Sequence, residues 1–219
     1  MSKSREPVES LLLYYLFKWS IVSPMLHLYF RGRIYGAENV PAAGSVILAS
    51  NHASFLDPPL VGAATTREIN YMARESLFRF PVLGSILRGV NAVPVDREGG
   101  GAAGLRAILD RLLAGGGIIL FPEGTRSANG ELQNAKSGIG LTVIKSAAPV
   151  VPVRVFGTFQ ALNRHQALPR PHRVAVRFGK ALDFTDLRTE AKTCSKPRLK
   201  EIYQEVANRI LQAISDLHN

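Results

Sequence analysis

Short apolar runs alternate with helix-length stretches along the central part of the chain, and this alternation predicts an α/β fold. The apolar runs are SVILAS (45–50), INYMA (69–73), NAVPV (91–95), GIILF (117–121) and VVPVRVF (150–156). Helix candidates lie between them, beginning at Pro58, near Leu77 and Pro81, and covering 102–113 and 137–146. Strands that are apolar throughout are typical of sheets buried on both faces. We therefore expect a single α/β domain with a mostly parallel sheet flanked by helices.

The carboxy-terminal part of the chain continues the same pattern with one strand and one long helix. RVAVRF (173–178) alternates between polar and apolar positions, which predicts a half-exposed strand. In the last segment, apolar residues recur at helical spacing and form one stripe, which predicts a helix packed on the core. The stripe consists of Leu199, Ile202, Val206, Ile210, Ile214 and Leu217.

The amino-terminal segment is the most apolar part of the chain, yet its pattern does not fit a membrane span. Lys18 interrupts the run, Ser23-Pro24 is expected to break the helix, and the apolar pieces are shorter than the roughly 20 residues that a bilayer requires. We expect residues 1–31 to form an interfacial, membrane-associated helical segment in front of a domain over residues 32–219. A helix that only packs on the domain is the alternative. The side chains expected at the lipid headgroups are Tyr14, Tyr15, Trp19, Tyr29, Lys18, Arg31 and Arg33.

The net charge of the chain limits the classes of partner that it is expected to bind. With 27 Lys and Arg against 17 Asp and Glu, the net charge is +10, which favours binding to polyanions. No signature of a nucleic-acid module is present, so we expect an anionic membrane surface as partner and no nucleic acid. The single cysteine, Cys194, excludes an intramolecular disulfide framework. These features predict a protein on the cytoplasmic face of a membrane, peripheral or monotopic.

The stretches richest in polar and charged side chains all follow predicted strands. NHASFLD follows SVILAS, DREGGG follows NAVPV, PEGTRS follows GIILF, and Gly157-Thr158 follows VVPVRVF. In a parallel sheet the carboxyl ends of the strands lie at one edge, where ligands bind. We therefore expect these four stretches to share one crevice.

The first of these stretches allows two interpretations of Asp57. Followed by Pro58, it is a good helix N-cap, which explains it without any catalytic role. His52 stands five residues earlier in the connecting turn, where the Asp57 carboxylate can orient one ring nitrogen and leave the other free as a general base. A single aspartate can serve both purposes.

The stretch FPEGTRS (121–127) has the composition of an anion site. Gly124 permits a tight turn, Arg126 offers a planar set of donors for a phosphate, and Thr125 and Ser127 add hydroxyls. Glu123 would repel a phosphate unless it is held away by Arg126 or binds substrate hydroxyls. Arg97, in VPVDRE, is a candidate for a second guanidinium at the same anion.

Two other functions remain open from the residues alone. Gly99, Gly101 and Gly104 satisfy the G-x-G-x-x-G pattern of a dinucleotide-dependent oxidoreductase, with Glu123 about 20 residues further on. The net charge and the apolar terminus also suit a non-catalytic protein that binds anionic lipids. The remaining histidines have no metal-ligand spacing, so we expect no metal.

Taken together, NHASFLD, VPVDRE, FPEGTRS and VVPVRVFGT resemble, in their order and separations, the four sequence blocks of the glycerolipid acyltransferases. The resemblance is specifically to the 1-acylglycerol-3-phosphate acyltransferase family with its HxxxxD motif, and it runs from about Tyr35 to Thr158. It implies an O-acyltransferase that moves a fatty acyl chain from acyl-CoA or acyl-carrier protein to the free hydroxyl of 1-acylglycerol 3-phosphate, giving phosphatidic acid. Another lysolipid or glycerol 3-phosphate is the alternative acceptor.

The resemblance also implies roles for individual residues. His52 is the expected general base, with Asp57 orienting it and stabilising its charge. The expected substrate-binding residues for the glycerol phosphate are Arg97, Glu123, Gly124, Thr125 and Arg126. The expected partners are a lysophospholipid acceptor and the acyl-CoA or acyl-carrier protein donor, with no bound cofactor.

Overall fold

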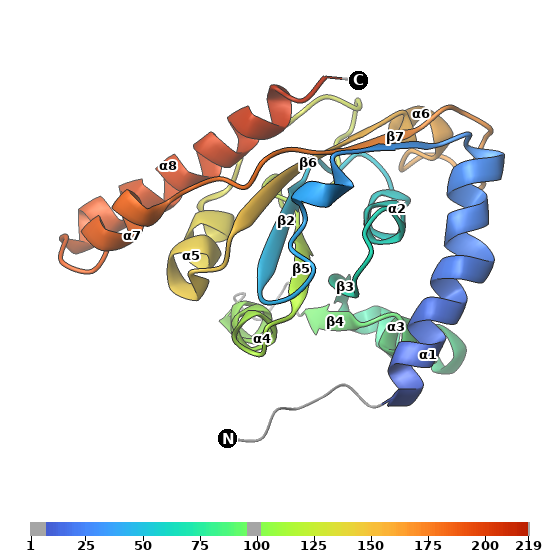
Figure 1. Cartoon of the computed structure of the whole chain (residues 1–219), viewed down its shortest axis with the longest axis horizontal. Helices are drawn as coiled ribbons and strands as arrows, with labels where there is room; N and C mark the ends of the chain where they lie inside the picture. The colour runs from blue at the N-terminus through green and yellow to red at the C-terminus, as the bar shows by residue number, and fades with distance from the viewer. Residues whose placement is uncertain (1–7, 96–101, 219) are drawn as a thin grey trace.

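The computed structural model describes residues 8–95 and 102–218, which fold around one seven-stranded sheet (Figure 1). The strand order is β1-β7-β6-β2-β5-β3-β4, and all neighbours pair in parallel except β6 and β7. The strands are β1 (Arg33–Tyr35), β2 (Val46–Ser50), β3 (Ile69–Arg74), β4 (Ala92–Val95), β5 (Gly117–Leu120), β6 (Val150–Phe156) and β7 (Ala175–Phe178).

Helices cover both faces of this sheet. The helices α1 (Val8–Phe17), α2 (Asp57–Ala63) and α3 (Pro81–Gly89) lie on one side, and α4 (Ala102–Leu113), α5 (Ser137–Ser146) and α8 (Lys196–Ser215) lie on the other (Figure 1). The shorter helical elements are η1 (Lys18–Val22), η2 (Met25–Tyr29), η3 (Ala37–Asn39), η4 (Glu75–Arg79), α6 (Thr158–Ala161) and α7 (Thr185–Glu190). The predicted α/β fold with a mostly parallel sheet is confirmed.

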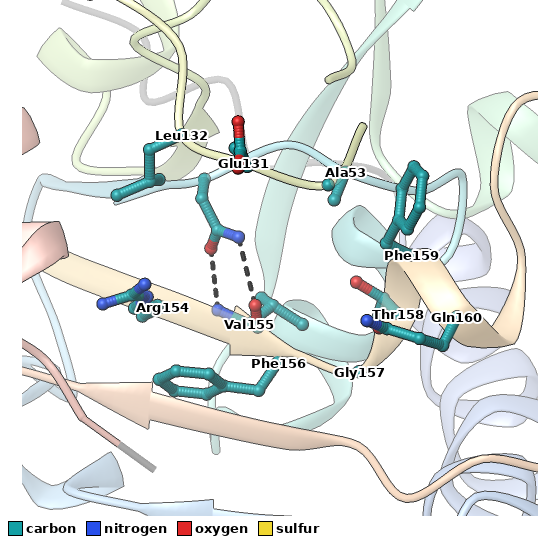
Figure 2. Close-up of a pocket in the computed structure, with 12 residues that line it drawn as sticks. Ala53, Glu131, Leu132, Arg154, Val155, Phe156, Gly157, Thr158, Phe159 and Gln160 are labelled. Carbon is teal, nitrogen blue, oxygen red and sulfur yellow. Dashed lines mark hydrogen bonds between the residues drawn. The ribbon is translucent and has the colours of Figure 1, made fainter. Parts of the chain in front are cut away.

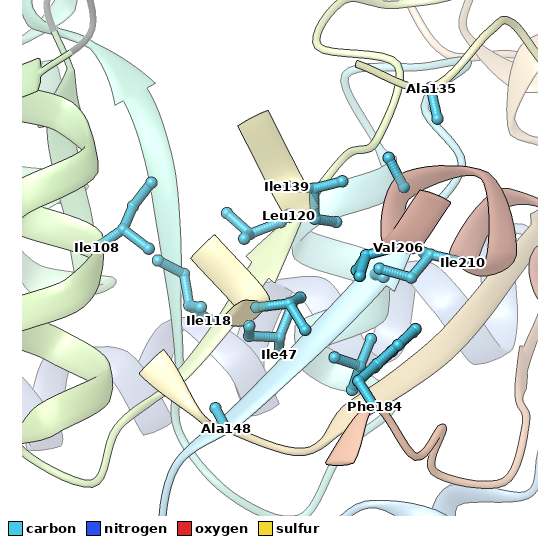
Figure 3. Close-up of a cluster of buried hydrophobic side chains, with 14 of the residues drawn as sticks. Ile47, Ile108, Ile118, Leu120, Ala135, Ile139, Ala148, Phe184, Val206 and Ile210 are labelled. Carbon is cyan, nitrogen blue, oxygen red and sulfur yellow. The ribbon is translucent and has the colours of Figure 1, made fainter. Parts of the chain in front are cut away.

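Strand β2 shows why the central runs are apolar at every position. Ile47 and Ala49 pack into the core under α5 and α8, while Val46 and Leu48 pack into a separate core on the other face. Figure 3 shows the first of these cores, where Ile47 and Ile118 of the sheet meet Ile139, Val206 and Ile210 of the helices. Both faces of β2 are buried in apolar cores, so its residues are apolar throughout and do not alternate with polar ones.

The expectation of a half-exposed strand at 173–178 is wrong. Strand β7 lies between β1 and β6, and three of its four residues are buried. Its alternation arises instead from Arg177, whose guanidinium stacks over the ring of Tyr35, 4.4 Å from the ring centroid. An arginine packed on an aromatic ring keeps its charge accessible while its stem covers apolar surface.

The amino-terminal helix continues through Ser23-Pro24, against the expected break. Both residues keep helical backbone angles, and the turns on either side are π-turns, η1 and η2. The Ser23 N–H donates to the Lys18 carbonyl, five residues back. Because a proline lacks an N–H and crowds the preceding turn, this wider register accommodates Pro24 within one helix.

Part of this helix faces the protein instead of lipid, which corrects the expectation for Tyr14 and Lys18. The Tyr14 hydroxyl lies 3.2 Å from that of Tyr71, and the Lys18 ammonium donates to the Thr65 carbonyl. Burial raises the pKa of Tyr14 and lowers that of Lys18. Further along, Val22, Leu26 and Phe30 are buried in a third core with α2.

The outward side of the same helix remains apolar. Exposed apolar side chains gather on α1 and η1 and on the neighbouring helix α3. This apolar face consists of Leu12, Leu16 and Trp19 together with Val82 and Ile86 of α3 and Phe80, the residue before α3. None of the helices over residues 8–95 and 102–218 is both long enough and apolar enough to cross a bilayer.

Candidate active site

Three of the four polar stretches lie at the carboxyl edge of adjacent strands. His52 follows β2, the segment from Glu123 to Arg126 follows β5, and Thr158 follows β6. Strand β2 pairs in parallel with both of the others, so the three stretches leave the sheet at the same edge. The fourth stretch, with Arg97, lies outside the residues that the structure describes.

His52 and Asp57 are in direct contact. The His52 Nδ1 lies 3.0 Å from Asp57 Oδ2, and the same oxygen accepts the backbone N–H groups of Ala53 and Ser54, both at 2.7 Å. Because this carboxylate oxygen accepts the two backbone N–H groups and has no proton to donate, Nδ1 is the protonated ring nitrogen. The other nitrogen, Nε2, is then the basic one.

The same contacts correct the expectation that Asp57 is an N-cap. Helix α2 begins at Asp57 itself, and the preceding residue, Leu56, makes no side-chain cap. The carboxylate turns back to the NHASF turn instead of capping the helix. Its position is set because Asp57 is fully buried between that turn and the first turn of α2.

The turn FPEGTRS holds His52 from three directions. The Phe121 ring stacks on the imidazole, with centroids 3.9 Å apart and an interplanar angle of 17°. Glu123 Oε1 accepts the His52 N–H at 2.8 Å, and the Ser127 N–H donates to the His52 carbonyl at 2.7 Å. Both the ring and the backbone of His52 are therefore fixed by residues more than 65 positions away.

Asn51 anchors the other side of this loop. Its side-chain amide donates to the Val155 carbonyl at 3.0 Å and its oxygen accepts the Val155 N–H at 2.7 Å, as the dashed lines in Figure 2 show. Asn51 and Ala53 line a cavity of about 370 Å³ at the end of β6, whereas His52 lines a different cavity. Alternate residues of the loop thus point to opposite sides.

His52 opens into a largely apolar groove of about 560 Å³. The walls come from the amino-terminal helix, α2, β3 and α3, and the polar side chains of Thr125 and Arg126 lie in the same lining as His52. The apolar lining residues include Phe17, Val22, Leu83, Ile86, Leu87 and Val90. A base and a cation therefore share a groove whose other walls suit an alkyl chain.

Arg126 is held at this groove by an aromatic contact. Its guanidinium carbon lies 3.4 Å from the centroid of the Phe55 ring, and its carbonyl accepts a hydrogen bond from Arg164. Gly124, two residues earlier, has a φ of +70°, a left-handed conformation that glycine adopts without strain. The turn predicted around Gly124 is present, and it carries Thr125 and Arg126 to the groove.

Glu123 occupies a different environment from its neighbours. It is 2% exposed, and its second oxygen, Oε2, accepts the Gln133 N–H at 3.1 Å. Burial raises the pKa of the Glu123 carboxyl, with a further rise from the nearby Asp57 carboxylate, while the two backbone N–H groups act in the opposite sense. Both oxygens accept backbone N–H groups inside the protein, and the buried carboxylate is not exposed to a ribose hydroxyl as the dinucleotide pattern would require.

Of the three glycines of the dinucleotide pattern, Gly99 and Gly101 lie outside the described residues, and Gly104 packs against Val95. Within 8–95 and 102–218, no three His, Cys, Asp or Glu side chains gather as metal ligands would.

Sequence reasoning missed three residues that shape the site: Asn51, Phe55 and Phe121. All three belong to the stretches NHASFLD and FPEGTRS, so their proximity to His52 and Arg126 along the chain was the available signal. Their contacts depend on the pairing of β2 with β5 and β6, which only the fold supplies. Ser127 was expected to offer a hydroxyl to the anion, but its hydroxyl bonds to Asn129 and Gly130, and its backbone N–H holds His52.

Several known proteins are similar to this chain. A family model described as Acyltransferase matches residues 31–156, more than half of the chain. The 1-acyl-sn-glycerol-3-phosphate acyltransferase of Bacillus subtilis is 28% identical over 179 residues, covering 81% of this chain and 85% of that protein. Chloroplastic enzymes of the same description from Brassica napus and Arabidopsis thaliana are 29% and 28% identical over 143 residues.

The match covers different fractions of the relatives' own lengths. The matched region is 64% of this chain for both plant proteins, but only 41% and 39% of their own length. Among solved structures, the 1-acyl-sn-glycerophosphate acyltransferase of Thermotoga maritima superposes over the whole of both chains with a TM-score of 0.65 and 22% identity. At that identity the likeness concerns the fold.

Proposed function

Because the chain belongs to the acyltransferase family, we propose that it transfers a fatty acyl chain from a thioester to the free hydroxyl of 1-acylglycerol 3-phosphate, giving phosphatidic acid. The observation that carries this proposal is the His52–Asp57 pair at an apolar groove that also holds Arg126. A base, an anion-binding cation and a site for an alkyl chain are what a lysophosphatidic acid acceptor requires. The relatives named for this activity support the same acceptor.

The proposed chemistry is a direct transfer. His52 Nε2 removes the proton from the acceptor hydroxyl, and the oxygen attacks the carbonyl carbon of the thioester. The tetrahedral intermediate collapses with cleavage of the carbon–sulfur bond, and the imidazolium returns its proton to the leaving thiolate. Asp57 holds Nδ1–H in place and stabilises the positive charge that His52 carries between these steps.

The acceptor is positioned in the groove by contacts with its phosphate and with its acyl chain. Arg126 and Thr125 bind the phosphate, because a guanidinium and a hydroxyl are good donors to phosphate oxygens and both line the groove with His52. Gly124 lets the turn approach closely, and Arg97 is the second cation expected from the sequence. The acyl chain follows the apolar walls toward α1 and α3.

The donor is the thioester of coenzyme A or of acyl-carrier protein. Both present the same phosphopantetheine thioester to His52, so the chemistry at the site is the same for either. No bound cofactor or metal is part of the proposed mechanism.

An acceptor panel with one long-chain acyl-CoA tests this function. We expect lysophosphatidic acid to be the preferred acceptor over glycerol 3-phosphate, lysophosphatidylglycerol and monoacylglycerol, measured as free thiol and as lipid product. In the same panel, Arg126→Ala should raise the KM for lysophosphatidic acid about tenfold or more, since it removes a charge-assisted hydrogen bond.

Monoacylglycerol serves as the control acceptor for Arg126→Ala, because it lacks the phosphate and its KM should not change. An equal rise of KM for both acceptors would place the phosphate elsewhere. Preference of the wild-type protein for another lysolipid would replace lysophosphatidic acid as the acceptor and leave the acyl transfer itself in place.

The lipid substrate and the apolar face together favour a protein bound to one side of a membrane. The apolar face on α1, η1 and α3 adjoins the groove, so a lysolipid can pass from the bilayer to His52 without crossing water. Exposed Arg31 and Arg33, which follow the end of the same helix, suit anionic headgroups. We place the protein on the cytoplasmic face, as a peripheral or monotopic protein.

Trp19, the only tryptophan, reports on this membrane contact. Its exposed ring should shift its emission to shorter wavelength when vesicles of phosphatidylglycerol and phosphatidylethanolamine are added. Leu16→Glu, on the apolar face, should weaken vesicle binding. Leu113→Glu is the matched control, because Leu113 is an exposed leucine of α4 on the other side of the sheet. Equal weakening by both variants, or no emission shift, would contradict the proposed orientation.

A further inference from the structure

The backbone of His52 is hydrogen-bonded at both of its polar atoms by one turn. Its N–H donates to Glu123 Oε1 at 2.8 Å, and its carbonyl accepts from the Ser127 N–H at 2.7 Å. Glu123 and Ser127 lie at the two ends of the turn that also carries Thr125 and Arg126. The turn expected to bind the acceptor is therefore also the turn that holds the base.

Glu123 links this turn to a third segment. Its Oε2 accepts the Gln133 N–H at 3.1 Å, in the loop that leads from the turn to α5. An ionised carboxylate has two acceptor oxygens and no donor, so it can satisfy two convergent N–H groups at once. A glutamine in its place has a single acceptor oxygen and would direct its NH₂ group at one of these two donors.

The surroundings of Glu123 exclude a direct contact with the acceptor. The side chain is 2% exposed, and it is absent from the lining of the groove that holds His52, Thr125 and Arg126. A substrate hydroxyl cannot reach either oxygen unless the surrounding loops open, because the carboxylate is buried beneath them.

We propose that Glu123 is a positioning residue for His52, not a substrate-binding residue. It fixes the backbone of the base relative to the turn that carries Arg126, and it thereby sets the distance between Nε2 and the acceptor hydroxyl. This inference rests on the proposed function, because the acceptor and the reaction are those given above. A displacement of about 1 Å in such a geometry is enough to cost up to about 10²-fold in rate.

The test is Glu123→Gln, compared with Glu131→Gln. Glu131 is an exposed glutamate of the neighbouring loop, so the control makes the same chemical change without touching His52. We expect Glu123→Gln to lower kcat between about 10- and 100-fold with an unchanged KM for lysophosphatidic acid. Glu131→Gln should leave both constants unchanged.

Two further measurements separate positioning from a loss of folded protein. Thermal unfolding gives the folded fraction at the assay temperature, and kcat is calculated per folded molecule. Hydrogen exchange should become faster in Glu123→Gln for the peptide that contains His52 or for the one that contains Gln133, because one of these two amides loses its acceptor. A loss of activity that disappears when kcat is corrected for the folded fraction would contradict the proposal.

A rise in the KM for lysophosphatidic acid with unchanged kcat would overturn the inference and restore Glu123 as a substrate ligand. If Glu123→Gln does not fold, Glu123→Asp replaces it, since the shorter carboxylate keeps its charge and reaches at most one of the two N–H groups. For Glu123→Asp as well, a lower kcat with unchanged KM would support positioning of His52, and a higher KM with unchanged kcat would contradict it. Failure of the wild-type protein to acylate any acceptor would contradict the proposed function instead, whereas faster exchange at His52 would still support the structural link.

Discussion

Replacing His52 with alanine is expected to lower the rate of acyl transfer by at least about 10²–10⁴-fold, the range that a general base contributes. The remaining structure supports a folded variant, because the contacts with Glu123 and Ser127 are made by backbone atoms that alanine retains. The side chain lost is one that faces the groove and stacks on Phe121. The rate of free thiol release, measured with lysophosphatidic acid and acyl-CoA, reports the loss.

His218→Ala is the matched control, because His218 is exposed near the carboxyl terminus. It should transfer acyl chains at the wild-type rate. Vesicle binding and the circular dichroism spectrum of His52→Ala should match those of the wild-type protein. A His52→Ala variant that is folded and fully active would show that another group removes the proton.

Asp57→Asn is expected to lower the rate about 10²-fold while the loop keeps its shape. The asparagine oxygen can still accept from Ala53, Ser54 and His52, since those three donors converge on Oδ2 alone. The ring therefore keeps its tautomer, and the variant loses the negative charge that stabilises the imidazolium. A charge-assisted hydrogen bond contributes about 1.5–3 kcal/mol, which corresponds to roughly 10- to 150-fold in rate.

The comparison that isolates this charge is Asp110→Asn, which makes the same change at an exposed position of α4 and should be silent. Asp57→Ala should lose more than Asp57→Asn, because it leaves three donors without their acceptor. Equal rates for Asp57→Asn and the wild-type protein would mean that Asp57 only shapes the turn.

The fold was predictable where the pattern of apolar residues reflects burial on both faces. The five central runs form β2 to β6, and the stretches 102–113 and 137–146 form α4 and α5 with the expected bounds. Strand β1 was not predicted, because RIY (33–35) is too short and too polar to stand out, and it is defined only by its pairing with β7. Tertiary pairing overrides local pattern in such short elements.

The terminal helix shows a different limit of sequence reasoning. Its apolar residues predicted a lipid-facing segment, but one side of the helix packs on the domain through Val22, Leu26 and Phe30. A run that is apolar on all sides does not reveal which side meets protein. The buried position of Lys18 was equally hidden, since its partner is a backbone carbonyl 47 residues away.

Some contacts of the site were also predictable from the sequence, whereas others depend on the fold. The HxxxxD spacing predicted a contact between His52 and Asp57, and the structure places their side chains 3.0 Å apart. The hydrogen bond from His52 to Glu123 joins residues 71 positions apart, and it depends on the parallel pairing of β2 with β5. Composition indicated that Glu123 belongs to the site, whereas its buried position and its backbone partners follow from the fold.

The most direct test of the account is the acceptor dependence of thiol release by the purified wild-type protein and by His52→Ala. With acyl-CoA and lysophosphatidic acid, the wild-type protein should release one thiol for each molecule of phosphatidic acid formed, and omission of the acceptor should stop the release. His52→Ala should lose both products together. Thiol release that continues without acceptor, or phosphatidic acid formed by His52→Ala at the wild-type rate, would contradict direct transfer to a hydroxyl activated by His52.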